Sequence, residues 1–207
     1  MRLGIKHPLA LLLALASVSA AQGAAQAPVQ PASTAEKPYR AELALGYTYL
    51  HSNAPPGGCG CFNLNGGNAT FAWAVVPGKW DLVGDVAADH ASNVSAAGYG
   101  LTLSAFTAGV RYIPPFHVSS LQPFGQVLLG VAHSSGTLVQ TPNAGSANAG
   151  AAFATNLGGG LDLKASRRFS IRLIEADYLL TTFDNGSNDH QNIVRVSAGV
   201  VVHFGER

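Results

Sequence analysis

Apolar and polar residues alternate with a period of two in eight separate stretches of the chain. In the clearest stretch, Gln191–Phe204, every second residue from Val194 onward is apolar, whereas Arg195 and His203 fall on the opposite face. A period of two with β-branched residues on the apolar side is typical of a strand and not of a helix. The same pattern predicts the other seven strands at Tyr39–Leu50, Asn68–Val76, Trp80–Asp89, Gly100–Tyr112, Pro123–His133, Ala152–Lys164 and Phe169–Thr182.

These strands are long enough to cross a bilayer, because a tilted transmembrane strand needs about 9–11 residues. A strand in lipid must pair along both edges, since no water is present to satisfy an open edge. The second partner of the last strand is then the first strand of the same chain. The pattern therefore predicts an all-β, eight-stranded, antiparallel, up-and-down transmembrane β-barrel over residues 38–205.

The connections alternate in length as well. Short ones are expected at Pro77–Lys79, Ile113–Ser120 and Ala165–Arg167, and long polar ones at His51–Gly67, His90–Tyr99, Ser134–Gly150 and Phe183–His190. Outer-membrane barrels show this asymmetry, with short periplasmic turns and longer outer loops. Five aromatic residues are expected at the turn end, where a girdle at the membrane interface belongs: Tyr39, Trp80, Tyr112, Phe169 and Phe204.

Composition agrees with a barrel that faces lipid. Apolar residues make up 47% of the 207 residues and charged residues only 11%, whereas about 25% of residues are charged in soluble domains. Apart from residues 8–18, the chain has no long apolar run that would favour a helical membrane protein. The low charge and the alternation together favour lipid-facing strands.

The N-terminal residues predict export. Arg2 and Lys6 precede an apolar run and then small residues, which is the pattern of a secretory signal peptide over residues 1–21. Residues 22–37 are rich in Ala, Gln and Pro and are expected to form a flexible periplasmic leader. Removing the signal leaves ten basic and eleven acidic residues, so we expect no binding to nucleic acid.

Several segments together resemble the OmpA-type family of small outer-membrane β-barrel domains. They are the GVRY segment at 109–112, PFGQVLLG at 123–130, LGGGLDL at 157–163 and the closing strand that ends in Phe204. The resemblance covers residues 38–205 and implies a location in the outer membrane of a Gram-negative type of cell envelope. It also implies that the barrel-assembly machinery recognises the closing strand during biogenesis.

The inward faces of the predicted strands carry charges, which we expect to form pairs because an unpaired buried charge costs several kcal/mol. Register estimates place Asp162 near Arg172 and Asp177 opposite Arg195, with Glu175 one step below, and bring Asp81 toward Arg111. These residues are expected either to plug the barrel structurally or to line a gated path for small ions. An eight-stranded barrel has an interior just wide enough for side chains to fill.

The stretch Phe169–Thr182 contains a conflict of parity. Ile171 and Leu173 favour lipid and turn Arg172 inward, whereas further along Tyr178 and Leu180 favour lipid and turn Asp177 inward. One uninterrupted period of two cannot satisfy both halves. An extra residue resets the alternation, so we predict a β-bulge at Leu173–Ile174.

Three further residue patterns bear on catalysis, metal binding and disulfide formation. His133 and Ser135 share a face and resemble the His-x-Ser pair of outer-membrane lipid deacylases, but no acid lies nearby in sequence before Asp162, so we predict that the chain is not an enzyme. The histidines form no short metal-ligand cluster, and nothing predicts a metal or a cofactor. Cys59 and Cys61 are expected to form a strained disulfide, an intermolecular bridge or free thiols.

The sequence thus favours a structural or surface-interaction role, in membrane integrity or adhesion, with outer-membrane lipid and an unidentified surface partner of the loops as the contacts. The alternatives are a narrow porin for small ions or solutes and, third, a lipid-modifying enzyme of the outer membrane.

Overall fold

A computed structural model describes residues 39–52, 61–92, 100–115, 120–136, 150–183 and 190–206. These residues form eight strands: β1 (Tyr39–Ser52), β2 (Phe62–Val76), β3 (Trp80–Ala91), β4 (Leu101–Tyr112), β5 (Leu121–Gly136), β6 (Gly150–Lys164), β7 (Phe169–Thr181) and β8 (Gln191–Glu206). Within the described ranges, no helix is long and apolar enough to cross a membrane. The predicted signal peptide and leader lie outside the described residues, as does most of each outer loop.

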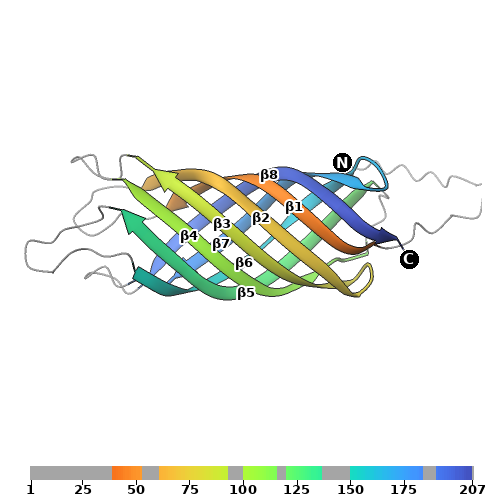
Figure 1. The fold of residues 1–207 in the computed structure, drawn as a ribbon, viewed down its shortest axis with the longest axis horizontal. Helices are drawn as coiled ribbons and strands as arrows, with labels where there is room; N and C mark the ends of the chain where they lie inside the picture. Colours follow the sequence, from red (N-terminus) through yellow and green to blue (C-terminus); the bar gives the residue numbers. More distant parts are fainter. Residues whose placement is uncertain are drawn as a thin grey trace, which may run out of the picture. The chain divides into compact units, whose positions relative to one another are not determined.

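Each strand pairs antiparallel with its neighbours in sequence, and β1 pairs with β8, so the sheet closes into a barrel (Figure 1). The seam runs from Tyr39 opposite Glu206 to Ser52 opposite Ile193. Closure confirms the predicted fold, and it leaves every strand paired on both edges. Backbone groups inside a lipid bilayer require such pairing.

The strands are staggered as well as closed. Starting at Glu42 and stepping from partner to partner around the barrel leads back to β1 at Ser52, ten residues further along, through Ala72, Val83, Gly109, Leu128, Asn156, Leu179 and Ile193. A stagger of this kind tilts the strands against the barrel axis, as Figure 1 shows. The tilt brings side chains from different depths of neighbouring strands to one level of the interior.

The outer face of the barrel is apolar. On β8, Val194, Val196 and Val200 are exposed, while the residues between them are mostly buried. Large exposed apolar side chains of this kind occur on all eight strands, for example Leu45, Phe71, Leu82, Phe106, Leu129, Leu157, Tyr178 and Val200. Such an apolar band around a closed barrel is the surface that lipid covers.

The aromatic residues at the turn end depart in part from the expected girdle. Trp80, Phe169 and Phe204 are exposed on the outer face, and Tyr112 packs beside Trp80 with ring centroids 4.8 Å apart. Tyr39 instead stacks on the inward-facing His203, at 4.1 Å between centroids. The ring of Tyr39 therefore contacts the inner side of the barrel's end.

The predicted bulge in β7 is confirmed. The register between β7 and β8 shifts between Arg172 and Glu175, and the register with β6 shifts at the same level. Leu173 and Ile174 are both exposed, at 45% and 47%, whereas Arg172 and Glu175 are both buried. One extra residue keeps both apolar side chains outside and both charges inside. A second irregularity, between Ala74 and Val76 of β2, was not expected.

Five strands, β1, β2, β3, β5 and β6, extend further toward the loops than predicted. The largest extension is in β2, which begins at Phe62 instead of Asn68. The expected loop His51–Gly67 was therefore too long. In the added part Leu64 is buried and Asn63 and Asn65 are exposed, which inverts the expected pattern. The outward side chains near the loop end are polar, and the inward ones are apolar.

Candidate functional site

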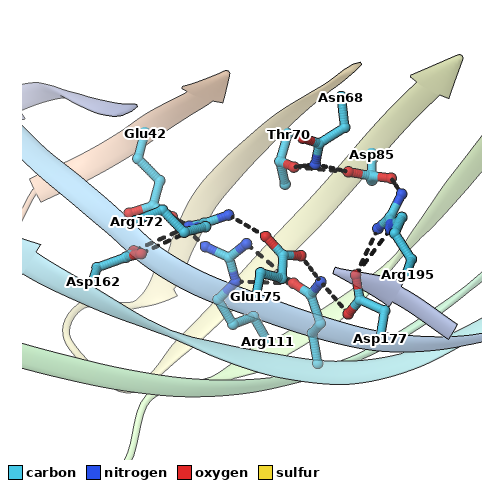
Figure 2. Close-up of polar contacts among 11 residues, drawn as sticks. Glu42, Asn68, Thr70, Asp85, Arg111, Asp162, Arg172, Glu175, Asp177 and Arg195 are labelled. Carbon is cyan, nitrogen blue, oxygen red and sulfur yellow. Dashed lines mark hydrogen bonds and ion pairs between the residues drawn. The ribbon is translucent and has the colours of Figure 1, made fainter. Parts of the chain in front are cut away.

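The interior of the barrel holds a network of buried charged side chains from six strands. Its members are Glu42 of β1, Asp81, Asp85 and Asp89 of β3, Arg111 of β4, Asp162 of β6, Arg172, Glu175 and Asp177 of β7, and Arg195 of β8. All except Glu42 are almost fully buried. Figure 2 shows most of these side chains converging inside the barrel. Strand alternation explains why they point inward, since each is flanked by outward-facing neighbours.

Arg172 binds two carboxylates. Its Nε and Nη2 donate to the two oxygens of Asp162 at 2.9 and 3.0 Å, which is a bidentate pair. Its Nη1 donates to Oε2 of Glu175 at 2.7 Å. Asp162 and Arg172 are register partners, so they lie close together as the sequence suggested. Bidentate arginine–carboxylate pairs are among the stronger polar contacts in proteins and fix both partners in orientation.

Arg195 likewise joins two strands. Its Nε and Nη2 donate to Oδ2 of Asp177 at 3.0 and 2.8 Å, and its Nη1 donates to Oδ2 of Asp85 at 2.8 Å. Asp177 and Arg195 are register partners, as the sequence suggested. Asp85 lies across the interior on β3, where its other oxygen accepts hydrogen bonds from Asn68 and Thr70 (Figure 2). One guanidinium therefore ties β7 and β8 to β3.

Arg111 does not form the expected pair. Asp81 is its register partner on β3, but the guanidinium donates to Glu42 of β1 and to Oε1 of Gln126. An arginine side chain is long enough to reach past its neighbouring strand into the lumen. Among the described residues, Asp81 makes no ion pair within 4.0 Å. The expected pairing of Asp81 with Arg111 is therefore wrong in its contact, although right in its register.

Two residues that the sequence did not single out connect these groups. Gln126 accepts from Arg111 and donates through Nε2 to Glu175 at 2.7 Å, so it links two arginine clusters. The ring of Phe124 lies beneath both Arg111 and Arg172, with guanidinium carbons 4.2 and 4.6 Å from its centroid. These are cation–π distances. The available signal was their inward parity on β5, alternating with the lipid-facing Val127.

Glycines on the inner face make room for the network. A Cβ on Gly158 would lie 2.0 Å from Oδ1 of Asp177, and one on Gly160 would lie 2.7 Å from the ring of Phe124. Asp177 and Phe124 thus each lie over a glycine of the adjacent strand. Gly158 and Gly160 of β6 are therefore required by this packing.

The interior carries an excess of negative charge. Among the described residues, six carboxylates are buried, and three guanidiniums are buried with them. Asp89 makes no ion pair with the described residues, and its Oδ1 accepts a hydrogen bond from Thr48. Buried Asn156 and Thr107 have side-chain polar atoms without a hydrogen-bond partner in the described part of the chain. These groups make the middle of the barrel strongly polar.

An apolar layer covers the network on the side of the loops. This apolar cap consists of Leu50, Leu64, Ala91, Leu101, Leu103, Ala132, Ala154, Leu179 and Ile193, with Phe62 and Phe183 packed against it. All nine cap residues are buried. The interior is thus filled by charges in the middle and by leucines toward the loops, which is the packed state expected of an eight-stranded barrel.

The remaining candidate residues are His133, the possible metal ligands and the two cysteines. His133 is exposed, and its register partners Ser104 and Ala151 are not acids. In the ranges described, no three His, Cys, Asp or Glu side chains are grouped to hold a metal. Cys61 is exposed just before β2. Cys59 lies outside the described residues, so the disulfide, the intermolecular bridge and the free thiols all stay predictions.

Comparisons with known proteins place the fold. No protein-family model matches the sequence, and no curated protein matches it. Among solved structures, Ail, the attachment invasion locus protein of Yersinia pestis, aligns with 16% identity and a TM-score of 0.54, covering 81% of this chain and 99% of that one. Neisserial surface protein A aligns with 14% identity and a TM-score of 0.59, covering 79% and 97%. The closed eight-stranded sheet, its apolar outer band and these alignments together show that the chain has the fold of the small outer-membrane β-barrels.

Proposed function

We propose that the protein is an outer-membrane β-barrel that acts through its surface and its outer loops, in attachment or membrane integrity, and not by transport through its interior. Export would use the signal peptide predicted at residues 1–21, followed by the leader at 22–37. The solved structures of similar fold include an attachment invasion protein and a surface protein. Their likeness supports the fold, and the proposal rests on the interior.

The observation that carries the proposal is the filled lumen. Arg195 of β8 and Asp85 of β3, three strands apart around the barrel, bridge the interior at 2.8 Å, and the apolar cap lies between this bridge and the loops. A hydrated ion would have to break the bridge and then pass a layer of leucines. Moving a charge into such an apolar environment is costly unless a partner accompanies it.

A specific feature favours a second candidate, a narrow cation path. Buried carboxylates outnumber buried guanidiniums by six to three among the described residues, so the interior would attract cations if the cap opened. Asp89, next to the cap in sequence, has no cation partner among those residues. A path of this kind would be selective for cations and would be closed in the resting barrel.

Conductance of the refolded full chain in planar bilayers separates the two candidates. The surface role predicts no stepwise conductance from the wild type, with folding verified by the altered gel mobility of unheated barrels. Cation-selective steps that change when Arg172 or Arg195 is replaced by Gln would establish the path and overturn the proposal. A Lys79→Gln variant is the matched control, because Lys79 is exposed in a turn outside the lumen.

The surface role itself is tested in cells. A strain that lacks the gene is expected to lose attachment to surfaces or to admit a large hydrophobic dye, and plasmid-borne wild type should restore the lost property. Lipid composition should stay unchanged, because the proposal includes no lipid-modifying activity. Altered acylation of outer-membrane lipid in this strain would instead support an enzyme.

A further inference from the structure

The exposed cations of the barrel are confined to one end. Arg40, Lys79, Arg167 and Arg168 are exposed at the turn end, where β8 also ends. At the loop end, the exposed residues of the described strands include no Lys or Arg. The sequence of the intervening outer loops, residues 53–60, 93–99, 137–149 and 184–189, contains none either. For the described strands and the outer-loop sequences, every exposed Lys and Arg therefore lies at the turn end.

Two of these cations adjoin outward aromatic rings. Lys79 precedes Trp80, and Arg168 precedes Phe169, and in both cases the aromatic residue is the first of its strand. Trp80 and Phe169 are exposed on the apolar outer face. Each cation thus lies one residue further from the apolar band than its ring. Aromatic rings at the headgroup level with cations just beyond them are the arrangement by which proteins engage a lipid–water interface.

Both turns are ordered by hydrogen bonds, so the cations have fixed attachment points. The hydroxyl of Ser166 accepts from the backbone N–H groups of Arg168 and Phe169 at 3.3 and 3.1 Å. In the β2–β3 turn, the N–H of Lys79 donates to the carbonyl of Val76 at 2.9 Å, and Gly78 adopts a φ of +72°. Arg40, Lys79, Arg167 and Arg168 form no ion pair with any described residue, so their charge is available to an external anion.

We propose that Lys79 in the β2–β3 turn, Arg167 and Arg168 in the β6–β7 turn four strands away, and Arg40 on β1 form a surface around the rim of the barrel's turn end. This surface binds the phosphate headgroups of anionic phospholipids in the leaflet at the turn end. The anion is a lipid headgroup and not a cell-wall polymer, because the neighbouring rings fix the cations at the depth where headgroup phosphates lie. This surface is separate from the lumen and does not depend on the role of the outer loops. It would also favour insertion with the turn end toward an anionic leaflet.

The experiment measures lipid selectivity of the full chain refolded into vesicles of phosphatidylcholine with a minor fraction of phosphatidylglycerol. Spin-labelled analogues of the two lipids report which one is enriched next to the protein. Each cation near an anionic interface strengthens association by about fivefold, so the wild type should prefer phosphatidylglycerol several-fold. The triple variant Lys79→Gln, Arg167→Gln, Arg168→Gln should lose most of this preference, and high salt should weaken it in the wild type.

A matched control replaces three exposed histidines at the loop end, His51, His90 and His133, by Gln, and it should keep the preference. Folding of all variants is checked by gel mobility, since the substitutions leave the backbone bonds of the turns intact. No preference in the wild type, or an unchanged preference in the folded triple variant, would overturn the proposal. Binding to purified cell-wall sacculi that depends on the three cations, without lipid preference, would assign the surface to that polymer and also overturn it.

Discussion

Breaking the contact between Asp177 and Arg195 should reveal how the barrel interior is held together. Arg195 is 1% exposed and serves two carboxylates, Asp177 and Asp85. Removing one partner of a buried ion pair costs about 3–5 kcal/mol because the other charge stays uncompensated. In Asp177→Asn, Arg195 keeps Asp85, so the cost should fall near the lower end, about 3 kcal/mol.

The reverse substitution should cost more. Arg195→Gln leaves two buried carboxylates that share no cation, so its loss of stability should lie at the upper end, about 5 kcal/mol. The double variant leaves Asp85 with its hydrogen bonds from Asn68 and Thr70. We therefore expect it to be more stable than the sum of the single losses predicts, by about 0.5–3 kcal/mol.

Urea unfolding of the vesicle-inserted protein, followed by the fluorescence of Trp73 and Trp80, measures these free energies. Both rings are exposed on the outer face, so their emission reports the loss of lipid contact. In vesicles of phosphatidylcholine alone, which lack anionic headgroups, the control Arg167→Gln removes an exposed charge and should change stability by less than about 0.5 kcal/mol. Additive losses, or a larger loss from Asp177→Asn than from Arg195→Gln, would refute the bridging role of Arg195.

Three further changes test other parts of the structure. Val200→Arg places a charge in the apolar band and should lower the free energy of unfolding in vesicles by about 2–4 kcal/mol. Val201→Arg points into the packed interior and should instead impair folding in detergent as well as in lipid. If Val200→Arg is as stable as the wild type, β8 is assigned to the wrong face. Deleting Leu173 should remove the bulge and leave an unbroken period of two with Arg172 and Glu175 both inward, so this variant should still insert, whereas deleting the outward Ala176 places Glu175 next to Asp177, turns one of these charges toward lipid and should abolish insertion. Failure of the Leu173 deletion to insert, or normal insertion of the Ala176 deletion, would contradict the bulge's role. Leu179→Ala in the apolar cap should lower the free energy of unfolding by about 2–5 kcal/mol in the same assay. A decrease below about 0.5 kcal/mol, as expected at an exposed position, would argue against a packed cap.

Much of the architecture followed from the sequence because alternation reports directly on which side of a strand a residue lies. The parity conflict between Arg172 and Asp177 even located the bulge, since a charge on the lipid face is costly. The orientation of side chains at the strand ends near the loops was harder to predict from the sequence. There the polar side chains of Asn63 and Asn65 face outward and the apolar Leu64 faces inward, so the usual inference from polarity to orientation inverts.

Some interior contacts could be predicted from the sequence and others could not. Pairs between adjacent strands, such as Asp162 with Arg172, follow from register, because the lengths of the turns fix which residues are opposite. Contacts across the lumen, such as Arg195 with Asp85, do not, since they depend on the stagger of the whole barrel and on side-chain reach. Gln126 was missed for a further reason. Its amide is uncharged, so no unpaired charge in the sequence indicated that it connects Arg111 with Glu175.

The seam between β1 and β8 has a consequence for how the chain reaches its folded state. Because Tyr39 pairs with Glu206 and Ser52 with Ile193, the contacts that complete the sheet join residues from opposite ends of the sequence. Any partly formed sheet has two unpaired edges, and such edges recruit other strands. Folding is thus expected to be slow and strongly cooperative, since long-range closure comes last. The same geometry predicts that a chain joined by a short linker between Tyr39 and Glu206, and reopened in an outer loop, would retain all eight strand pairings.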